Sequence, residues 1–231
     1  MHKIITFDLD GTLCPPSKGM TAEDIKKLHE LEAAGYKIVI CSGKPSYYLC
    51  GFMRQIGLRS PILIGENGAT IQYGVALPPE RYIVHPHSKD IKAQREAIRA
   101  LIDEACGDNV WYQPNELALT PFPKNDPTFD VIQKIIDDNK DALGEFFVYR
   151  HKDSFDLSPK NISKHSALCI LAREEGVSSK DFIAVGDGIN DVPMFEFADI
   201  SIGVNWKDDF VPSLKFDSVT AALEYLLTEK P

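Results

Sequence analysis

Two short apolar runs in this 231-residue chain each end directly in a cluster of acidic residues. Residues 4–7 run into Asp8-Leu9-Asp10-Gly11, and residues 182–185 run into Gly-Asp-Gly-Ile-Asn-Asp at 186–191. A strand that only fills a core does not place carboxylates at its tip, whereas open α/β sheets bind ligands just beyond the carboxyl ends of their strands. The pattern therefore predicts an α/β fold in which two distant segments meet at one edge of a sheet.

Strand-like and helix-like segments alternate on both sides of a central stretch. Each strand-like run is short and apolar, and each helix-like run has apolar residues at helical spacing. Such alternation predicts a doubly wound, mostly parallel, Rossmann-like sheet. The expected strands are 3–8, 36–41, 62–64, 182–185 and 200–204, and the expected helices are 21–34, 163–175, 192–197, 218–227 and one that begins at Pro45.

The pattern changes near residue 73 and predicts a small inserted α+β domain with an antiparallel sheet and helices on one side. We therefore expect a catalytic core at 1–74 and 154–231 and an inserted cap at 75–153 that sets substrate specificity. The elements expected in the insert are strands 81–84, 109–112, 116–120, 145–149 and 154–157 and helices 88–105 and 126–138.

Composition excludes several classes of protein. The net charge of −9 argues against nonspecific binding to nucleic acid or to anionic membranes. No run approaches the roughly 18 apolar residues of a membrane helix. The five cysteines are odd in number and lack C-x-x-C spacing, so they indicate reduced thiols. Because Met1-His2-Lys3 leads into a strand without a signal-like apolar region, we expect a cytoplasmic protein. The sequence does not indicate an oligomeric state.

Asp8 and Asp10 have the spacing of a catalytic pair. In extended backbone, residues i and i+2 point the same way, so both carboxylates would face one pocket. Two close carboxylates repel, which raises one pKa and separates their roles: the ionised group attacks phosphorus and the protonated group donates to the leaving oxygen. Gly11 permits the tight turn that follows. The alternatives are a turn that merely ends a strand, or a calcium loop, but the further oxygen ligands of an EF-hand are missing.

Asp187, Asn190 and Asp191 offer the oxygen ligands that suit Mg²⁺, which often binds one or two carboxylates together with substrate phosphate. The alternative is a glycine-rich turn whose Asp and Asn side chains only bond the local backbone. A purely local turn is a weaker explanation if Asp8 lies at the tip of a neighbouring strand, because the two acidic segments would then meet. These residues therefore predict a metal-assisted reaction of a phosphate group.

Two further positions are candidates for holding phosphate. Ser42-Gly43 ends the second strand just before a helix, where a hydroxyl and a backbone N–H can bind a phosphoryl oxygen. Lys164, at the start of another helix, would neutralise the charge of the phosphate and keep Asp8 ionised. The alternative for Ser42 is a simple helix cap, and the alternative for Lys164 is a solvated lysine.

Taken in order, these segments resemble the motifs of the haloacid dehalogenase (HAD) superfamily of phosphatases. The matching residues are Asp-Leu-Asp-Gly-Thr at 8–12, Cys-Ser-Gly at 41–43, Lys164, and Gly-Asp-Gly-Ile-Asn-Asp at 186–191. The insert resembles the cap of the Cof-type IIB subgroup, and residues 64–69 resemble the segment by which that subgroup enters its cap. The resemblance implies that the cap closes over the leaving group and excludes water.

The resemblance also implies a role for each residue. Asp8 would be the nucleophile and a Mg²⁺ ligand, and the reaction would form and hydrolyse an aspartyl-phosphate. Asp10 would act as general acid and then as general base, and its backbone carbonyl would reach the metal. The other expected site residues are Ser42, Gly43, Lys164 and Asn190 for phosphate, Asp187 for the metal, and Asp191 in support of the metal site.

Two other functions remain open at this point: a phosphosugar mutase of the same superfamily, and a non-catalytic protein that binds a phosphorylated metabolite. The basic residue that a phosphomannomutase carries after the first motif is not evident around Pro15-Pro16-Ser17. Loss of Asp8, Asp10 or Asp187 would have favoured a binding protein, and all three are present. We therefore expect a phosphatase acting on a small phosphorylated metabolite.

The substrate depends on the cap. Arg150-His151-Lys152 would recognise a carboxylate or a second phosphate, as in phosphoglycolate, whereas a neutral sugar phosphate would prefer Asn, Asp and aromatic partners. Both classes stay open. The candidate cap residues, each of which is also compatible with plain polar surface, are Tyr112, Asn115, Arg150, His151 and Lys152. The chain departs from the subgroup at Lys44, where Arg is common, and at His165, where Gly is common.

Overall fold

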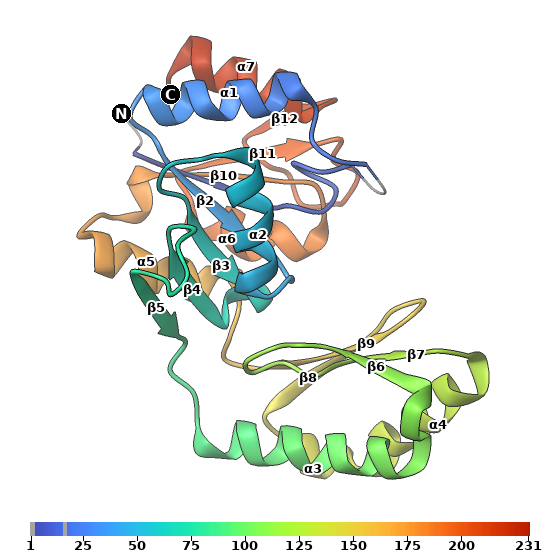
Figure 1. Cartoon of the computed structure of the whole chain (residues 1–231). Helices are drawn as coiled ribbons and strands as arrows, with labels where there is room; N and C mark the ends of the chain where they lie inside the picture. Colours follow the sequence, from blue (N-terminus) through green and yellow to red (C-terminus); the bar gives the residue numbers. More distant parts are fainter. Residues whose placement is uncertain (1–2, 16–17) are drawn as a thin grey trace. The chain divides into compact units, whose positions relative to one another are not determined.

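The computed structural model describes residues 3–15 and 18–231, and the chain divides into two compact units. The first unit comprises Met1–Val84 and Ser163–Pro231, and the second comprises His85–Ile162. Each unit is described by itself (Figure 1). The Met1-His2 start and the Pro16-Ser17 segment, on which the signal-peptide and mutase arguments drew, lie outside the described residues.

The first unit is built on an eight-stranded sheet with the order β12-β11-β10-β1-β2-β3-β4-β5 (Figure 1). The strands from β12 to β3 are parallel to their neighbours, and β4 and β5 extend the sheet antiparallel. This confirms the predicted doubly wound, mostly parallel sheet. The strands are β1 Ile4–Phe7, β2 Lys37–Cys41, β3 Ile62–Gly65, β4 Thr70–Tyr73, β5 Arg81–Val84, β10 Phe182–Gly186, β11 Ile200–Val204 and β12 Leu214–Phe216.

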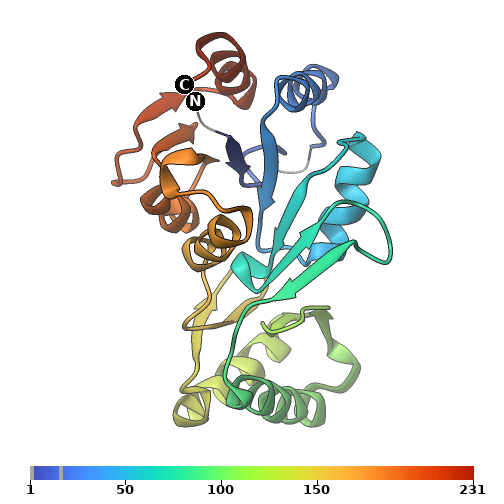
Figure 2. The same cartoon turned by 90° about the vertical axis from the view of Figure 1, so that its left-hand side faces the viewer.

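Successive residues of a strand point to opposite faces of the sheet. Both faces are therefore apolar, and helices cover each of them. Ile5 of β1 packs with α1, α2 and α7, whereas its neighbour Ile4 packs with α5 and α6. Figure 2 shows α1 (blue) and α7 (red) at the same end of the first unit, and Thr220 of α7 donates to Asp24 of α1 across 2.7 Å. The helices are α1 Ala22–Ala33, α2 Ser46–Ile56, α5 Lys164–Glu175, α6 Val192–Phe197 and α7 Val219–Glu229.

The second unit pairs two helices with two β-hairpins. The hairpins β6–β7 and β8–β9 are joined where Leu119 and Leu157 exchange backbone hydrogen bonds of 3.1 and 2.9 Å. The apolar faces of the helices pack against one side of these strands around Phe155, Ile98 and Ile132. The elements are α3 Lys89–Cys106, β6 Val110–Gln113, β7 Thr120–Pro123, α4 Asp126–Asp138, β8 Phe146–Arg150 and β9 Phe155–Pro159.

The inserted unit differs in extent from the expected 75–153. The strand expected at 81–84 exists, but it pairs with β4 in the large sheet, with Thr70 opposite Val84. The unit therefore begins at His85 and, because β9 completes its second hairpin, ends at Ile162. Strand β4 and strand β12 were not expected from the sequence. Which strand a segment pairs with depends on long-range contacts that a local pattern does not contain.

One strand of the second unit is shifted along the chain. A strand was expected at 116–120, but β7 occupies Thr120–Pro123. Pro121 lies opposite Tyr112, and Pro123 lies opposite Val110. Because proline has no backbone N–H and is rare inside sheets, its presence argues against a strand when the sequence is read alone.

Among the described residues, no helix is both long enough and apolar enough to cross a lipid bilayer.

Candidate active site

The two acidic clusters meet at one edge of the large sheet, as the sequence predicts. Strands β1 and β10 are neighbours, with Phe7 opposite Val185, and the Asp8 backbone N–H donates to Val185 O across 2.9 Å. Carboxylate oxygens of Asp8, Asp187 and Asp191 all lie within 4.8 Å of one another. Parallel strands present their carboxyl ends at the same edge, so segments separated by more than half of the chain share one site.

Lys164 lies inside this carboxylate cluster. Its Nζ donates to Asp8 Oδ1 across 2.7 Å and to Asp191 Oδ1 across 2.6 Å, and its side chain is only 1% exposed. Lys164 is the first residue of α5, and Ser163 caps that helix by a capping box with Ser166. Burial alone would lower the pKa of Lys164, but the carboxylates of Asp8 and Asp191 raise it above its ordinary value. The ammonium therefore stays charged, and the alternative of a solvated lysine is wrong.

Asp191 holds the second acidic loop together. Its Oδ2 accepts hydrogen bonds from the backbone N–H groups of Asp187, at 2.9 Å, and Gly188, at 3.2 Å. A Cβ at Gly186 would collide with the Asp191 carboxylate, so only glycine fits there. Asp191 is completely buried and both of its oxygens are engaged. This geometry gives Asp191 a local structural role in addition to its place in the cluster.

Thr12 is a site residue to which the sequence reasoning assigned no role. Its hydroxyl donates to Asp187 Oδ1 across 2.8 Å, and the residue is fully buried. Its neighbour Gly11 has a φ of 95°, and a Cβ there would overlap the Asp187 carboxylate. The signal was available, since a hydroxyl residue directly after Asp-x-Asp-Gly must lie near the strand tip. Together, Gly11 and Thr12 let the first loop contact and orient Asp187.

Burial raises the pKa of the Asp8 carboxyl to about 7, with Lys164 opposing this shift and the carboxylates of Asp191 and Asp187 adding to it. Burial likewise raises the pKa of Asp187. From the sequence, repulsion between Asp8 and Asp10 was expected to raise the pKa of one of them, and Lys164 was expected to keep Asp8 ionised. In the structure the raised pKa belongs to Asp8 itself. The carboxylates that act on Asp8 instead come from the second loop, because the second loop closes directly against the end of β1.

Asp10 lies in a different environment from Asp8. Strand β1 ends at Phe7, and the following backbone turns, with Gly11 N–H donating to Cys14 O across 2.7 Å. Both carboxylates therefore follow the end of the strand, and they differ in burial, since Asp8 is buried and Asp10 is exposed. The Asp10 carboxylate is exposed and lies 3.8 Å from the ammonium of Lys44. An exposed position of this kind permits proton exchange with a bound molecule and with water.

Strand β2 brings Ser42 to the same sheet edge, on the opposite side of β1 from β10. The Ser42 hydroxyl accepts a hydrogen bond from the Lys44 N–H at 3.2 Å. Because α2 begins at Ser46 with Pro45 as its N-cap residue, Ser42 is not the helix cap that the sequence left as an alternative. Asn190 is exposed in the short helical turn Ile189–Asp191 of the second loop. His165, which follows Lys164, packs edge-on against Phe197, with ring centroids 5.5 Å apart.

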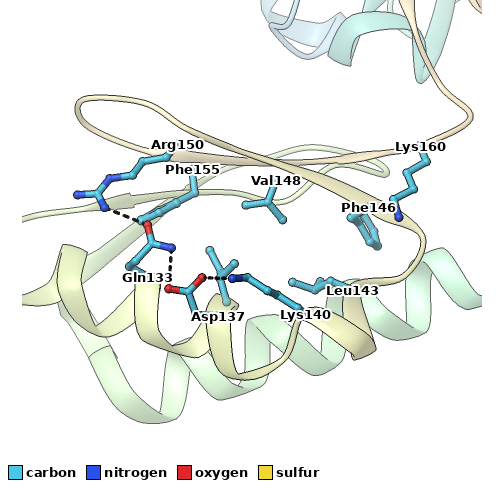
Figure 3. A pocket seen from close by; sticks show the side chains of 10 residues that line it. Gln133, Asp137, Lys140, Leu143, Phe146, Val148, Arg150, Phe155 and Lys160 are labelled. Atoms are coloured by element: carbon cyan, nitrogen blue, oxygen red, sulfur yellow. Dashed lines mark hydrogen bonds and ion pairs between the residues drawn. The ribbon is translucent and has the colours of Figure 1, made fainter.

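The candidate cap residues do not form one cluster. Arg150 lines a cavity of about 280 Å³ between α4 and β8, where its guanidinium donates to Gln133 across 3.1 Å (Figure 3). His151 instead contacts Asp156 at 3.2 Å. Tyr112 donates to Asp103 across 2.8 Å, on the helical side of the strands. Arg150 and His151 therefore contact different partners and do not present their side chains to one common anion.

The carboxylate cluster fits a divalent cation. The cluster contains three carboxylates and one ammonium, which contacts Asp8 and Asp191, so its net charge is negative by two when all of these groups are ionised. The hydrogen bonds from Lys164 and Thr12 engage Oδ1 of Asp8 and Oδ1 of Asp187, and each carboxylate retains a second oxygen. Hard divalent cations such as Mg²⁺ prefer oxygen ligands of this kind. Asp8 and Asp187 are thus the candidate ligands, with Asp191 behind them.

Comparison with known proteins agrees with this arrangement. The family model of haloacid dehalogenase-like hydrolases matches residues 5–130 and 117–211. A phosphoglycolate phosphatase of Methanoculleus marisnigri is 29% identical over 213 residues, covering 88% of this chain and 84% of the relative. A solved structure from Thermotoga maritima has a TM-score of 0.76 at 18% identity, covering 97% of each chain.

The likeness extends to a solved structure from a named subclass. A sugar phosphatase of HAD subclass IIB has a TM-score of 0.68 at 18% identity, covering 97% of this chain and 98% of its own. At this identity the match shows that the fold is shared. The family-model match covers most of the chain, including both acidic loops. The chain therefore belongs to the haloacid dehalogenase-like hydrolase family.

Proposed function

We propose that this hydrolase is a Mg²⁺-dependent phosphatase that removes phosphate from a small phosphorylated metabolite through an aspartyl-phosphate intermediate. The observation that carries the proposal is the buried Asp8 carboxylate, which shares Lys164 with Asp191 and lies beside Asp187. Such a group is a poor structural element, because burying several carboxylates is costly. A metal ion and a phosphoryl group bound at this position would give the buried carboxylates a function, as metal ligands and as the nucleophile.

In the first step, an oxygen of Asp8 attacks phosphorus while the bond from phosphorus to the leaving oxygen breaks. Asp10 donates a proton to that oxygen, so the product leaves as a neutral alcohol. In the second step, Asp10 takes a proton from a water molecule as the water attacks phosphorus, and Asp8 is released. The exposure of Asp10 supports this double role, because both the leaving group and the water must reach it.

Lys164 and the Ser42–Gly43 backbone are assigned to the phosphoryl oxygens, and Asn190 is assigned to the rim of the same site. Lys164 is held in place before the substrate binds, so its charge needs no reorganisation during the reaction. When bound at Asp8 and Asp187, with the Asp10 carbonyl as a further ligand, Mg²⁺ would supply positive charge to the phosphoryl group. Asp191 and Thr12 would orient the metal ligands.

The choice of leaving group is assigned to the second unit, His85–Ile162, because none of the residues assigned above belongs to it. The candidate substrates are sugar phosphates and phosphoglycolate-like monoesters. The curated relative from Methanoculleus marisnigri supports the second class by its name, and the subclass IIB sugar phosphatase supports the first.

Phosphate release from a panel of phosphorylated metabolites tests the proposal. The panel comprises hexose phosphates, phosphoglycolate, glycerol phosphates, nucleotides and pyridoxal phosphate, each with Mg²⁺ and with EDTA. We expect Mg²⁺-dependent release from at least one substrate and none from the Asp8→Asn variant, which keeps the shape of the side chain and removes the attacking charge. Turnover that survives this substitution would exclude the aspartyl-phosphate mechanism, and a folded protein that releases no phosphate would exclude the function.

A further inference from the structure

The turn Glu66–Gly68, which follows β3, has an unusual backbone. Its three residues all have positive φ angles, of 54° for Glu66, 54° for Asn67 and 120° for Gly68. Residues other than glycine rarely adopt this conformation, and two of them in succession store strain. Such strain persists only where the surrounding structure fixes it, and it concentrates at functional sites. The contacts of this turn show what fixes it.

The turn contacts both ends of the loop Ser42–Lys44, which contains the two residues, Ser42 and Gly43, that are assigned to phosphate. The Glu66 N–H donates to Lys44 O across 3.0 Å, and the Asn67 N–H donates to Ser42 O across 2.9 Å. The left-handed backbone aims these two successive N–H groups at carbonyls two residues apart. The conformation of Ser42–Lys44 is thus tied directly to the strained turn.

The other side of the turn lies against the start of α5. A Cβ at Gly68 would overlap the Ser163 carbonyl and would lie 3.1 Å from the Ala167 side chain. Lys164, which binds Asp8 and Asp191, directly follows Ser163. One short turn therefore contacts both elements to which phosphate binding is assigned.

The Asn67 side chain completes the contact with the loop. A Cβ placed on Gly43 would lie 3.3 Å from Asn67 Nδ2 and 3.5 Å from Oδ1, so the amide group lies against the Gly43 backbone. Asn67 is half-buried, whereas Glu66 and Gly68 beside it are buried. The amide consequently occupies the side of the turn that faces the loop.

We propose that Asn67 is a positioning residue of the phosphate site, a role that rests on the proposed function. Its amide and its left-handed backbone hold the Ser42 hydroxyl and the Gly43 N–H where a phosphoryl group binds. The competing explanation is conformational only, because asparagine tolerates a left-handed backbone better than most residues. Under that explanation glycine would serve equally well at position 67.

The chain offers a matched control for this distinction. Asn205 also has a positive φ, of 48°, but its N–H donates to Phe216 O in the connection between β11 and β12. Asn205→Gly and Asn67→Gly therefore relieve the same kind of backbone strain. Only the second substitution removes an amide that lies against Gly43.

The test is titration of inorganic phosphate into each protein with Mg²⁺ present, followed calorimetrically, together with kcat and KM for the best substrate and the thermal midpoint. We expect both glycine variants to unfold at or above the wild-type temperature. Asn67→Gly should bind phosphate at least tenfold more weakly and lose at least tenfold in kcat/KM. Asn205→Gly should remain within twofold of wild type in both quantities.

Unchanged phosphate affinity in Asn67→Gly would overturn the proposal, whatever happens to turnover. A wild-type protein that binds phosphate but hydrolyses nothing would refute the proposed function, and the phosphate titrations would still decide the role of Asn67. A wild-type protein that binds no phosphate would refute both.

Discussion

Replacement of Lys164 by methionine tests whether the buried ammonium compensates the carboxylate cluster. Methionine is unbranched, so Lys164→Met removes the charge with little loss of packing volume. The ammonium lies 2.7 Å from Asp8 and 2.6 Å from Asp191, and all three side chains are buried. Removing one partner of a buried ion pair costs about 3–5 kcal/mol, because the other charge is left uncompensated. We expect a loss of stability of that size at pH 8 in EDTA.

In a chain of this length each kcal/mol shifts the thermal midpoint by about 2–4 °C, so the expected fall is about 6–20 °C. The loss should be smaller at pH 6. The Asp8 pKa already lies at about 7, and without Lys164 the carboxyl would be held protonated to higher pH. Saturating Mg²⁺ should restore part of the loss by supplying the missing positive charge.

Calorimetric unfolding suits this measurement, because it can separate the transitions of two units. Lys26→Met is the matched control, since Lys26 forms an exposed pair with Glu30 on α1. Such pairs contribute about 0.3–0.5 kcal/mol, so this variant should unfold close to wild type. The reasoning would be refuted if Lys164→Met in EDTA at pH 8 were no less stable than Lys26→Met.

Three further predictions follow from the same site. In EDTA, the free energy of unfolding should fall as pH rises from about 4 to about 7, because folded Asp8 binds a proton more tightly than the unfolded carboxyl does. Urea titrations at several pH values should show this fall, and the Asp8→Asn variant should show a smaller dependence on pH. Thr12→Val removes the hydroxyl that orients Asp187, and should weaken Mg²⁺ binding about 10–100-fold by calorimetric titration; unchanged affinity would contradict the assigned role. Gly11→Ala places a Cβ 2.6 Å from Asp187 Cγ at a φ of 95°. Both the affinity for Mg²⁺ and the thermal midpoint should therefore fall. An unchanged Mg²⁺ titration would contradict this expectation and would show that the loop adjusts to the added methyl group.

Much of the fold could be predicted from local patterns. The helix expected at 126–138 is α4 with the same bounds, and Thr21 caps α1 as its position before an amphipathic run suggests. Short apolar runs between helices gave the parallel strands of the large sheet. In each case the signal is local, because capping, turn chemistry and apolar periodicity depend on neighbours within a few residues.

The strand pairing at the domain boundary could not be predicted in this way. Residues 81–84 read as a strand in either domain, and only the hydrogen bonds with β4 place them in the large sheet. The position of β7 was also misjudged, because its two prolines suit an irregular segment equally well. Pairing partners are chosen by contacts between segments, so boundaries that depend on pairing are decided in three dimensions.

The sequence by itself determined which residues are candidates for the site: carboxylates at two strand tips, Ser42 at a third, and Lys164 at a helix start. Only the tertiary structure decided how deeply these residues are buried, how their pKa values shift and which side chains bond to them. It buries Lys164 against Asp8, 156 residues away, and turns Asp10 toward solvent. It also shows that Thr12 donates to Asp187 and that the backbone N–H of Asn67, in a turn with positive φ, donates to the Ser42 carbonyl. Burial, pKa and hydrogen-bond partners depend on packing between distant segments, whereas residue type and spacing are properties of the sequence itself.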